Sequence, residues 1–313
     1  QIVCRTSTDG GKTWTAPKPT YEWKWNDKEH WAASDPSFVV DNEAKKIFLF
    51  YNVWECIGKA GIYQHWVQES IDNGKTWSKP REITKDIHRD EWPEKAFVFI
   101  SSGSGTQMKD GTLLHTIVWV GKHVALFGSE DHGKTWKAVG KPCSPGDECK
   151  VVELSDGRWM INSRCYPGSR EVFVSSDKGE TWSHKRDTTL IDAQCNAQII
   201  SYPVAAARPG KPLKEGVPER VLLFSNCNRP VRERKNLTIR TSWDDGDTWN
   251  DGYVVDPGDS AYSDMTILPD GSIGIIWEGA GYDSIVFFAA IIAISPTSYE
   301  AAQIDGANKW AQM

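Results

Sequence analysis

Apolar residues along the chain gather in short runs bounded by turn-forming residues. Such runs, rich in β-branched and aromatic side chains, are typical of strands. Asp-Gly pairs at 110–111, 156–157 and 270–271 supply the turns of tight hairpins between runs. Only the tail after Ser298 has a pattern compatible with a helix. The sequence therefore predicts an all-β protein, with its main strand candidates at 45–54, 111–120, 196–204, 220–226 and 272–278.

One phrase, Ser-x-Asp-x-Gly-x-Thr-Trp, recurs along the chain. In each copy the Ser and Asp side chains can bond backbone N–H groups, the Gly can take a positive φ, and the Trp can anchor a hairpin in a core. We interpret this phrase, an Asp box, as structural. Its spacing matches the length of a four-stranded unit, which indicates the radially repeated antiparallel sheets of a β-propeller. The five copies stand at 7–14, 70–77, 129–136, 175–182 and 242–249.

Composition and charge narrow the range of partners. The chain has 313 residues, of which 39% are apolar and 25% charged, and this is enough to build a large globular core. Its net charge of −6 disfavours nucleic acid or an anionic membrane as a partner, so an anionic ligand needs a local basic pocket. The apolar run at 284–295 is too short to span a bilayer and predicts a buried strand.

The seven cysteines include no CxxC pair and no Cys–His cluster with zinc spacing, so we expect no metal site. Free buried thiols are favoured. A disulfide between Cys143 and Cys149 is the alternative. The chain starts with Gln and shows no signal peptide, as expected of a processed, trimmed or partial chain.

The segment 146–165 is predicted to be a hairpin that carries a charged residue at each open end. Its two strands are joined by an Asp-Gly turn, with Glu148 at the start of the first and Arg164 at the end of the second. Because an antiparallel hairpin brings its two ends together, this carboxylate and this guanidinium are expected to meet.

The segment 260–279 repeats that construction with Tyr262 and Glu278 at its ends. Arg234 precedes the strand that leads into the fifth box. Each of these side chains alone is compatible with a structural role, as a surface ion pair, a solvated charge or a packed aromatic. Their joint placement on one side of a propeller favours a functional site.

At these residues the sequence resembles the exo-α-sialidases of bacterial and trypanosomal type, which are six-bladed β-propellers. The resemblance extends over nearly the whole chain. The Asp boxes are moderately specific for it, whereas the two hairpins in combination are highly specific. The matching stretches, in family order, are "SDPSFVVD" (34–41), "GSGTQMKDGTLL" (103–114), "SEDHGKTW" (129–136), "DECKVVELSDGRWMINSR" (147–164) and "AYSDMTILPDG" (261–271) with "WE" (277–278).

The resemblance implies specific roles for these residues. Tyr262 would be the nucleophile that forms a covalent sialyl-enzyme, and Glu148 its general base. Arg164 and Arg234 would be two of three arginines that bind the substrate carboxylate. Glu278 would orient the first arginine of that triad.

Two further residues, Asp35 and Asn196, fall at positions that line the sugar pocket in relatives. The substrate implied is a terminal sialoside of a glycoprotein, glycolipid or oligosaccharide. Bidentate arginines suit its carboxylate, and a neutral Tyr avoids bringing a second anion to the anomeric carbon. No cofactor is implied. We expect a monomer, secreted or periplasmic because sialoglycans lie outside cells.

The sequence departs from the family at its beginning. The family's first triad arginine, in an Arg-Ile-Pro motif, and its acid/base Asp both precede the first box, but only six residues precede Ser7 here and no Arg-Ile-Pro occurs. Arg5, beside the box, is not a substitute. We therefore expect a propeller over 1–298 that lacks roughly 40–60 N-terminal residues, followed by a tail over 299–313.

Other functions are compatible with the same sequence. The missing arginine and Asp are compatible with a propeller that binds sialic acid without cleaving it. A trans-sialidase or a hydrolase of deaminated sialic acid would share the architecture. A purely structural scaffold would leave the matched spacing of Tyr262 and Glu278 unexplained.

Overall fold

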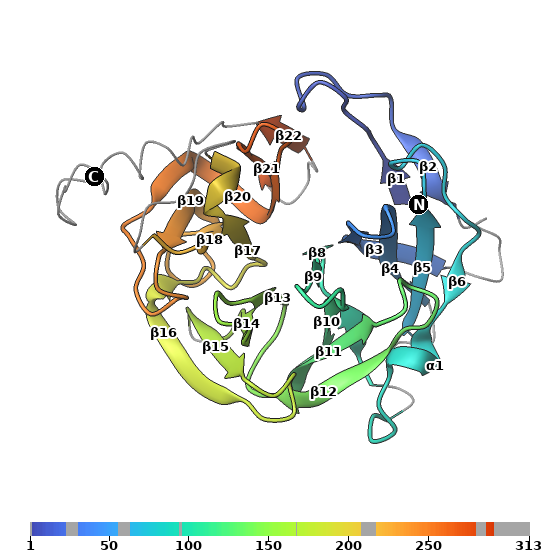
Figure 1. Ribbon diagram of the computed structural model, residues 1–313, viewed down its shortest axis with the longest axis horizontal. Coiled ribbons are helices and arrows are strands. Elements are labelled where there is room, and N and C mark those ends of the chain that lie inside the picture. The colour runs from blue at the N-terminus through green and yellow to red at the C-terminus, as the bar shows by residue number, and fades with distance from the viewer. Residues whose placement is uncertain are drawn as a thin grey trace.

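The computed structural model describes residues 2–22, 31–55, 63–93, 96–166, 168–207, 217–279 and 286–290. Strands predominate in this part of the chain, and the helical elements are single turns, α1 (Thr84–Ile87) and the 3-10 turn η1 (Val204–Ala207). The sheets stand around a common centre and follow one another clockwise in chain order (Figure 1). The predicted all-β propeller is confirmed.

The strands fall into antiparallel units around the ring. The first unit holds β1 (Ile2–Cys4) and β2 (Lys18–Tyr21), and the second holds β3 (Trp31–Asp41), β4 (Lys46–Glu55), β5 (Tyr63–Ser70) and β6 (Arg81–Glu82), with β8 (Gly103–Ser104) parallel to β3. The third holds β7 (Val98–Ile100), β9 (Thr106–Gln107), β10 (Leu113–Trp119), β11 (His123–Ser129) and β12 (Lys137–Cys143). The fourth holds β13 (Cys149–Glu153), β14 (Trp159–Ser163), β15 (Ser169–Ser175) and β16 (Ser183–Ile191).

The last two units share one long strand, β20 (Tyr253–Ile267). Its first half pairs with β19 (Lys235–Ser242), which continues to β18 (Arg220–Cys227) and β17 (Gln198–Pro203). Its second half pairs with β21 (Ile273–Gly279), which continues to β22 (Val286–Ala290). With the two halves of β20 counted apart, the described strands make six units.

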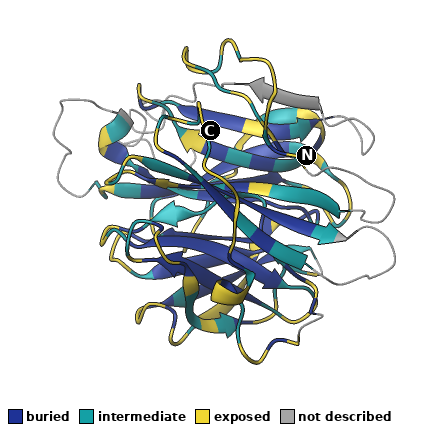
Figure 2. Ribbon diagram, turned by 90° about the vertical axis from the view of Figure 1, so that its right-hand side faces the viewer, coloured by how far each residue is buried: buried dark blue, intermediate teal, exposed yellow. Residues whose placement is uncertain are grey.

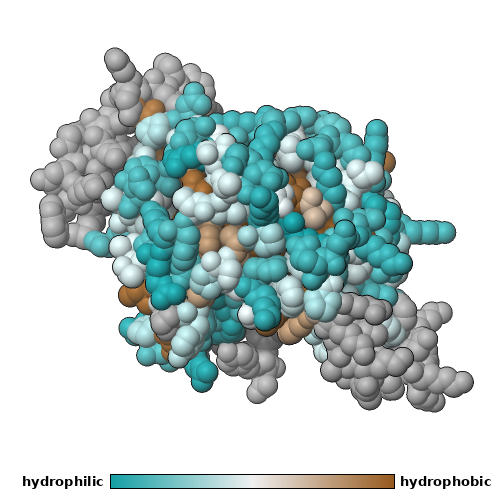
Figure 3. Space-filling view, turned by 90° about the horizontal axis from the view of Figure 1, so that it is seen from below, coloured by the Kyte–Doolittle hydropathy of each residue, from teal (hydrophilic) through white to brown (hydrophobic). Residues whose placement is uncertain are grey.

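The apolar cores lie between neighbouring sheets rather than at the centre of the ring. On β13, Cys149 and Val151 pack towards the third unit, while Val152 packs towards the fifth. This alternation follows from the pleat of a strand, whose successive side chains point to opposite faces. Buried strands therefore fill the interior (Figure 2), and the face seen in Figure 3 is largely hydrophilic with separate small apolar patches.

The five predicted Asp boxes are confirmed as hairpin turns between antiparallel strands: β1–β2, β5–β6, β11–β12, β15–β16 and β19–β20. In the third box, the Ser129 hydroxyl accepts a hydrogen bond from Gly133 N at 2.8 Å, and Asp131 accepts bonds from both Thr135 N and Thr135 Oγ1. Trp136 is buried against the apolar core between the second and third units. The predicted Asp-Gly turns also join strands, at β9–β10, β13–β14 and β20–β21.

The structure tests the predictions about the cysteines but describes only part of the C-terminal region. The cysteines 4, 143, 149, 165, 195 and 227 are free thiols, so the alternative disulfide between Cys143 and Cys149 is wrong. Cys56, the tail over 299–313 and its helical pattern lie outside the described residues. Of the apolar run 284–295, only β22 is described, and it is a strand as predicted. The domain boundary at 298 stays a prediction.

Candidate functional site

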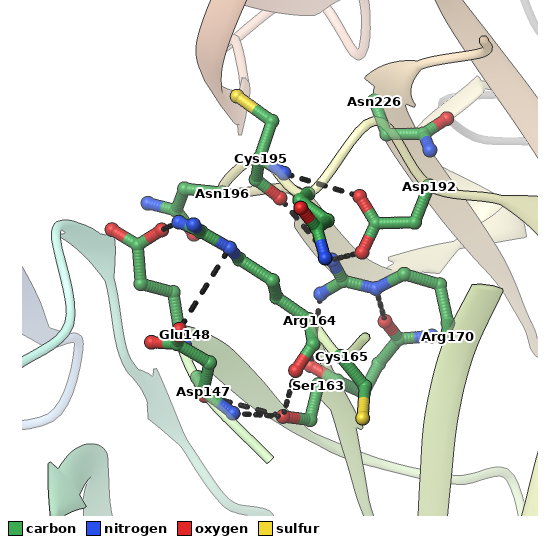
Figure 4. A network of polar contacts seen from close by, with 12 residues as sticks. Asp147, Glu148, Ser163, Arg164, Cys165, Arg170, Asp192, Cys195, Asn196 and Asn226 are labelled. Atoms are coloured by element: carbon green, nitrogen blue, oxygen red, sulfur yellow. Dashed lines mark hydrogen bonds and ion pairs between the residues drawn. The ribbon is translucent and has the colours of Figure 1, made fainter. Parts of the chain in front are cut away.

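The open ends of the two predicted hairpins face each other at the middle of the ring. The first hairpin, β13–β14, closes beyond its strands through Arg164 N to Glu148 O at 2.9 Å and Asp147 N to Arg164 O at 2.9 Å. The Arg164 guanidinium donates through Nη1 to Glu148 Oε2, and its Nε lies 3.9 Å from Asp147 Oδ2 (Figure 4). Glu148 is only 2% exposed, so this ion pair is shielded on the carboxylate side.

The second hairpin, β20–β21, presents Tyr262 and Glu278 side by side. A register irregularity between Ser260 and Ser263 places Tyr262 opposite Glu278, and Tyr262 N donates to Glu278 Oε2 at 3.5 Å. The Tyr262 phenol lies close enough to the Glu148 carboxylate for each group to shift the pKa of the other. The two hairpins, which belong to the fourth and sixth units, are therefore joined at their open ends by a phenol–carboxylate contact.

A second guanidinium approaches the phenol from the segment before β19. Arg234 Cζ lies 5.7 Å from the centroid of the Tyr262 ring, and Arg234 Nη2 donates to Gln194 O at 3.2 Å. The positive charge of Arg234 also opposes the rise in the pKa of Glu278 that burial causes. Two guanidiniums, those of Arg164 and Arg234, therefore lie near the Tyr262 phenol.

Burial dominates the electrostatics of the phenol and its carboxylate partner. It raises the pKa of Glu148, against the opposing charge of Arg164 and the hydrogen bond from Tyr262. Burial also raises the pKa of Tyr262, and the adjacent negative charge of Glu148 raises it further. The phenol therefore stays protonated at neutral pH unless Glu148 accepts its proton as it reacts.

Asp35 lies on β3 with a positive φ of 51° and is held by three donors. Ser34 Oγ donates to it at 2.7 Å, Asn52 Nδ2 at 3.2 Å and Ser102 Oγ at 3.0 Å. Its negative charge contributes to the raised pKa of Glu278, so the two carboxylates lie near each other. The structure therefore places Asp35 with the other predicted residues, and its role towards a sugar stays a prediction.

Asn196 lies directly before β17 and is buried, with its side-chain amide bonded at both ends. Its Oδ1 accepts from Lys150 Nζ at 2.8 Å, and its Nδ2 donates to Ser102 O at 3.1 Å. These bonds point away from solvent and link the inner strands of three units. Its predicted contact with a sugar stays a prediction.

The sequence reasoning missed the groups that hold these residues in place. A fully buried ion pair joins Arg170 Nη1 to Asp192 Oδ2 at 2.9 Å, and Arg170 also donates to Cys195 O (Figure 4). Cys195 N donates to Asp192 Oδ1 in turn. This network fixes the turn 192–196, which carries both Gln194 and Asn196. The sequence did contain one sign of buried polar contacts at this turn. Lys150, which bonds to Asn196, is a charged residue within the largely apolar run of β13.

Within the described ranges, no group of three or more His, Cys, Asp or Glu side chains is arranged to hold a metal ion. No helix in the same part of the chain is long and apolar enough to cross a membrane.

Comparison with known proteins supplies independent findings. A family model described as a BNR repeat-like domain matches residues 1–275. A sialidase of Micromonospora viridifaciens is 37% identical over 308 residues, which cover 88% of this chain and 44% of that protein. A sialidase of Bacteroides fragilis is 29% identical and covers 88% and 53%.

Among solved structures, the Hadza microbial sialidase Hz136 superimposes with a TM-score of 0.76 at 30% identity, covering 88% of this chain and 56% of that one. The chain thus spans about half the length of these relatives.

Proposed function

The chain belongs to the sialidase family of BNR-repeat propellers, and we propose that its central site removes terminal sialic acids from glycans by a retaining mechanism with Tyr262 as the nucleophile. The observation that carries the proposal is the meeting of the Tyr262 phenol with the buried Glu148 carboxylate beside the Arg234 guanidinium. The names of the relatives support the substrate class.

The two arginines give the site its affinity for an acidic sugar. A sialic acid has a carboxylate on its anomeric carbon, and planar guanidiniums bind carboxylates through paired hydrogen bonds. Arg164 and Arg234 both lie near Tyr262, so a carboxylate bound by these arginines would bring the anomeric carbon close to the phenol oxygen. A carboxylate nucleophile would meet that anion with like charge, whereas a neutral phenol does not.

Two displacements complete the reaction. In the first, the Tyr262 oxygen bonds to the anomeric carbon as Glu148 takes the phenol proton, and the glycosidic bond breaks as the leaving oxygen takes up a proton from solvent. In the second, water attacks the anomeric carbon and releases a proton to solvent, the bond to Tyr262 breaks, and Glu148 returns its proton to the phenolate. The configuration at the anomeric carbon is thereby retained, and no redox partner is needed.

The test is release of fluorophore from a 4-methylumbelliferyl sialoside by this chain, beside a Tyr262→Phe variant. The methylumbelliferyl oxygen leaves without a proton, so this substrate does not depend on a general acid. We expect turnover by the chain and a loss of about 10⁴-fold or more in Tyr262→Phe, as for removal of a catalytic nucleophile elsewhere. Equal rates in both proteins would refute the nucleophile.

Other outcomes would replace hydrolysis with another function. Saturable binding of sialic acid without turnover would mean that the propeller binds and does not cleave. Sialyl-lactose formed from lactose as acceptor would mean transfer instead of hydrolysis. The proposal implies action outside the cell on sialosides of glycoproteins, glycolipids or oligosaccharides, by a monomer. Sedimentation of the purified chain tests its oligomeric state.

A further inference from the structure

Lys150 is a fully buried cation beneath the candidate site. It is 1% exposed, and its ammonium donates to Asn196 Oδ1 at 2.8 Å. Burial lowers the pKa of Lys150, and the negative charges of Asp264 and Glu148 oppose this effect. A lysine is almost never buried this completely unless it is paired, so its position needs a physical reason.

The ammonium has an opposite charge nearby, on β20 of the sixth unit. A Cβ atom added to Gly103 would lie 3.4 Å from Lys150 Nζ and 3.6 Å from Asp264 Cγ, so both groups adjoin the same point of β8. Asp264 accepts hydrogen bonds from Ser104 Oγ at 2.9 Å and from Gln198 Nε2. Lys150 and Asp264 are therefore neighbouring opposite charges, and the direct hydrogen bond of the ammonium is to Asn196.

Lys150 and Asp264 follow the two candidate catalytic residues at the same spacing. Lys150, on β13, follows by two residues Glu148, which directly precedes that strand, and Asp264 follows Tyr262 by two residues on β20. Side chains two residues apart in extended backbone point to the same face. Lys150 and Asp264 are therefore the next residues inward on the same two faces, and the one cation acts on both carboxylates.

The charged and titratable groups around the two residues come from several elements. Glu148 is faced by Arg164, Asp147, Tyr262, Cys195 and Lys150. Lys150 is faced by Asp264, Glu148, Cys149, Arg170 and His115. Burial lowers the pKa of His115 to about 3, so this imidazole is neutral at neutral pH. The cations nearest the Glu148 carboxylate are therefore Arg164 and Lys150, and substrate binding engages Arg164.

We propose that Lys150 is a positioning residue, which supplies the permanent buried charge that keeps Glu148 ionised and holds Asn196 against Ser102 below the sugar site. This inference rests on the proposed function, because it assigns Lys150 a task in preparing the general base. Arg164 interacts with the substrate carboxylate and cannot stabilise Glu148 alone throughout the reaction. Lys150 has no access to solvent or substrate, so its charge is available at every step.

The experiment compares three variants with the unchanged chain. Lys150→Met removes the cation but leaves the Asp264 carboxylate without the opposite charge near it, which destabilises a fold. Asp264→Asn removes the carboxylate alone. The double variant Lys150→Met/Asp264→Asn removes both charges, so it keeps the centre neutral. Both the double variant and Asp264→Asn lack the Asp264 charge. A difference between these two variants therefore reports only the loss of the Lys150 cation.

The first readout is the pKa of Glu148 itself. Carbon-13 NMR of side-chain carboxyls in a glutamate-labelled chain follows its titration, and the signal missing in Glu148→Gln identifies it. We expect the pKa of Glu148 to be higher in the double variant than in Asp264→Asn by about one unit, because removal of a nearby opposite charge disfavours the carboxylate. The acid limb of kcat/KM should move to higher pH by the same amount.

The outcomes separate this inference from the proposed function. An unchanged pKa of Glu148 in the folded double variant would overturn the inference, even if turnover fell. A raised pKa of Glu148 in a chain without hydrolysis would support the electrostatic role of Lys150 and refute only the proposed activity. Lys150→Arg keeps the positive charge, so its kcat/KM should fall at the same acidic pH as in the unchanged chain. If the role of Lys150 were purely structural, this pH would not change in any of the variants.

Discussion

The rim of the propeller, where the Asp boxes lie, and its centre use the same residue types in opposite ways. In the boxes, carboxylates are exposed or partly exposed and bond to groups two or four residues away, such as Asp72 with Ser70 and Thr76. Hydrogen bonds from Thr76 lower the pKa of Asp72 to about 2. At the centre, burial raises the pKa of Glu148, Glu278 and Asp264.

The two regions differ in how far along the chain the hydrogen-bond partners of their polar groups lie. A box is complete within eight residues, so it forms wherever its sequence occurs and stabilises its own hairpin. The central site is assembled from residues far apart in sequence, such as Lys150 with Asn196 and Asn196 with Ser102. Carboxylates in the boxes are therefore stable anions, whereas those at the centre keep proton affinities suited to catalysis.

After Tyr262→Phe, the largest expected effect at the centre is that of Glu148→Gln. A general base contributes about 10²–10⁴-fold to a rate, so we expect turnover of the methylumbelliferyl sialoside to fall by about 10³-fold. Because burial raises the pKa of Glu148 above its usual 4.5, activity of the unchanged chain should fall as pH drops through that raised value. Initial rates across pH measure both effects.

A carboxylate at the other end of the same strand is the control for that prediction. Glu153 closes β13 on the side of the boxes, where its Oε2 accepts from Lys109 N at 2.6 Å. Glu153→Gln should retain turnover within about twofold and leave the pH profile unchanged. If both variants lost activity equally, the distinction between centre and rim would be wrong.

Loss of a buried charge at the centre should cost more stability than loss of one at the rim. Asp192→Asn leaves the Arg170 guanidinium buried without its counter-ion, which should lower the free energy of unfolding by about 3 kcal/mol. Glu130→Gln breaks the exposed pair with Lys137, in which both side chains are more than half exposed. We expect less than about 1 kcal/mol there. Urea denaturation of the variants measures the difference, and similar losses would contradict it.

Most of the fold could be predicted because its signals are local. The apolar run 45–54 became β4, and the Asp-Gly turn at 156–157 joins β13 to β14 as expected. The pairing of Glu148 with Arg164 follows from the same hairpin logic. The helix α1 is too short to show a helical period of apolar residues in the sequence, so it was not predicted.

The central contacts could not be derived in the same way. Nothing in the spacing of Tyr262 and Glu148 shows that the fourth and sixth units bring them together, and only the family resemblance pointed to it. The turn 192–196 depends on Arg170, which lies in a different strand. Contacts of this kind are set by closure of the ring, which pairs residues without any short-range pattern.

A smaller loss of stability than that of Asp192→Asn is expected for Ser129→Ala in the third box. This change leaves the buried Gly133 N–H without its acceptor, so the free energy of unfolding should fall by about 1–2 kcal/mol. The matched change Ser7→Ala affects a partly exposed copy of the same bond, where water can replace the hydroxyl, and should cost less. Urea denaturation gives both values. Turnover per folded molecule should be unchanged in both variants, because neither side chain reaches the centre. A loss of turnover in folded Ser129→Ala would show that the boxes influence the site, and the separation between rim and centre would then not hold.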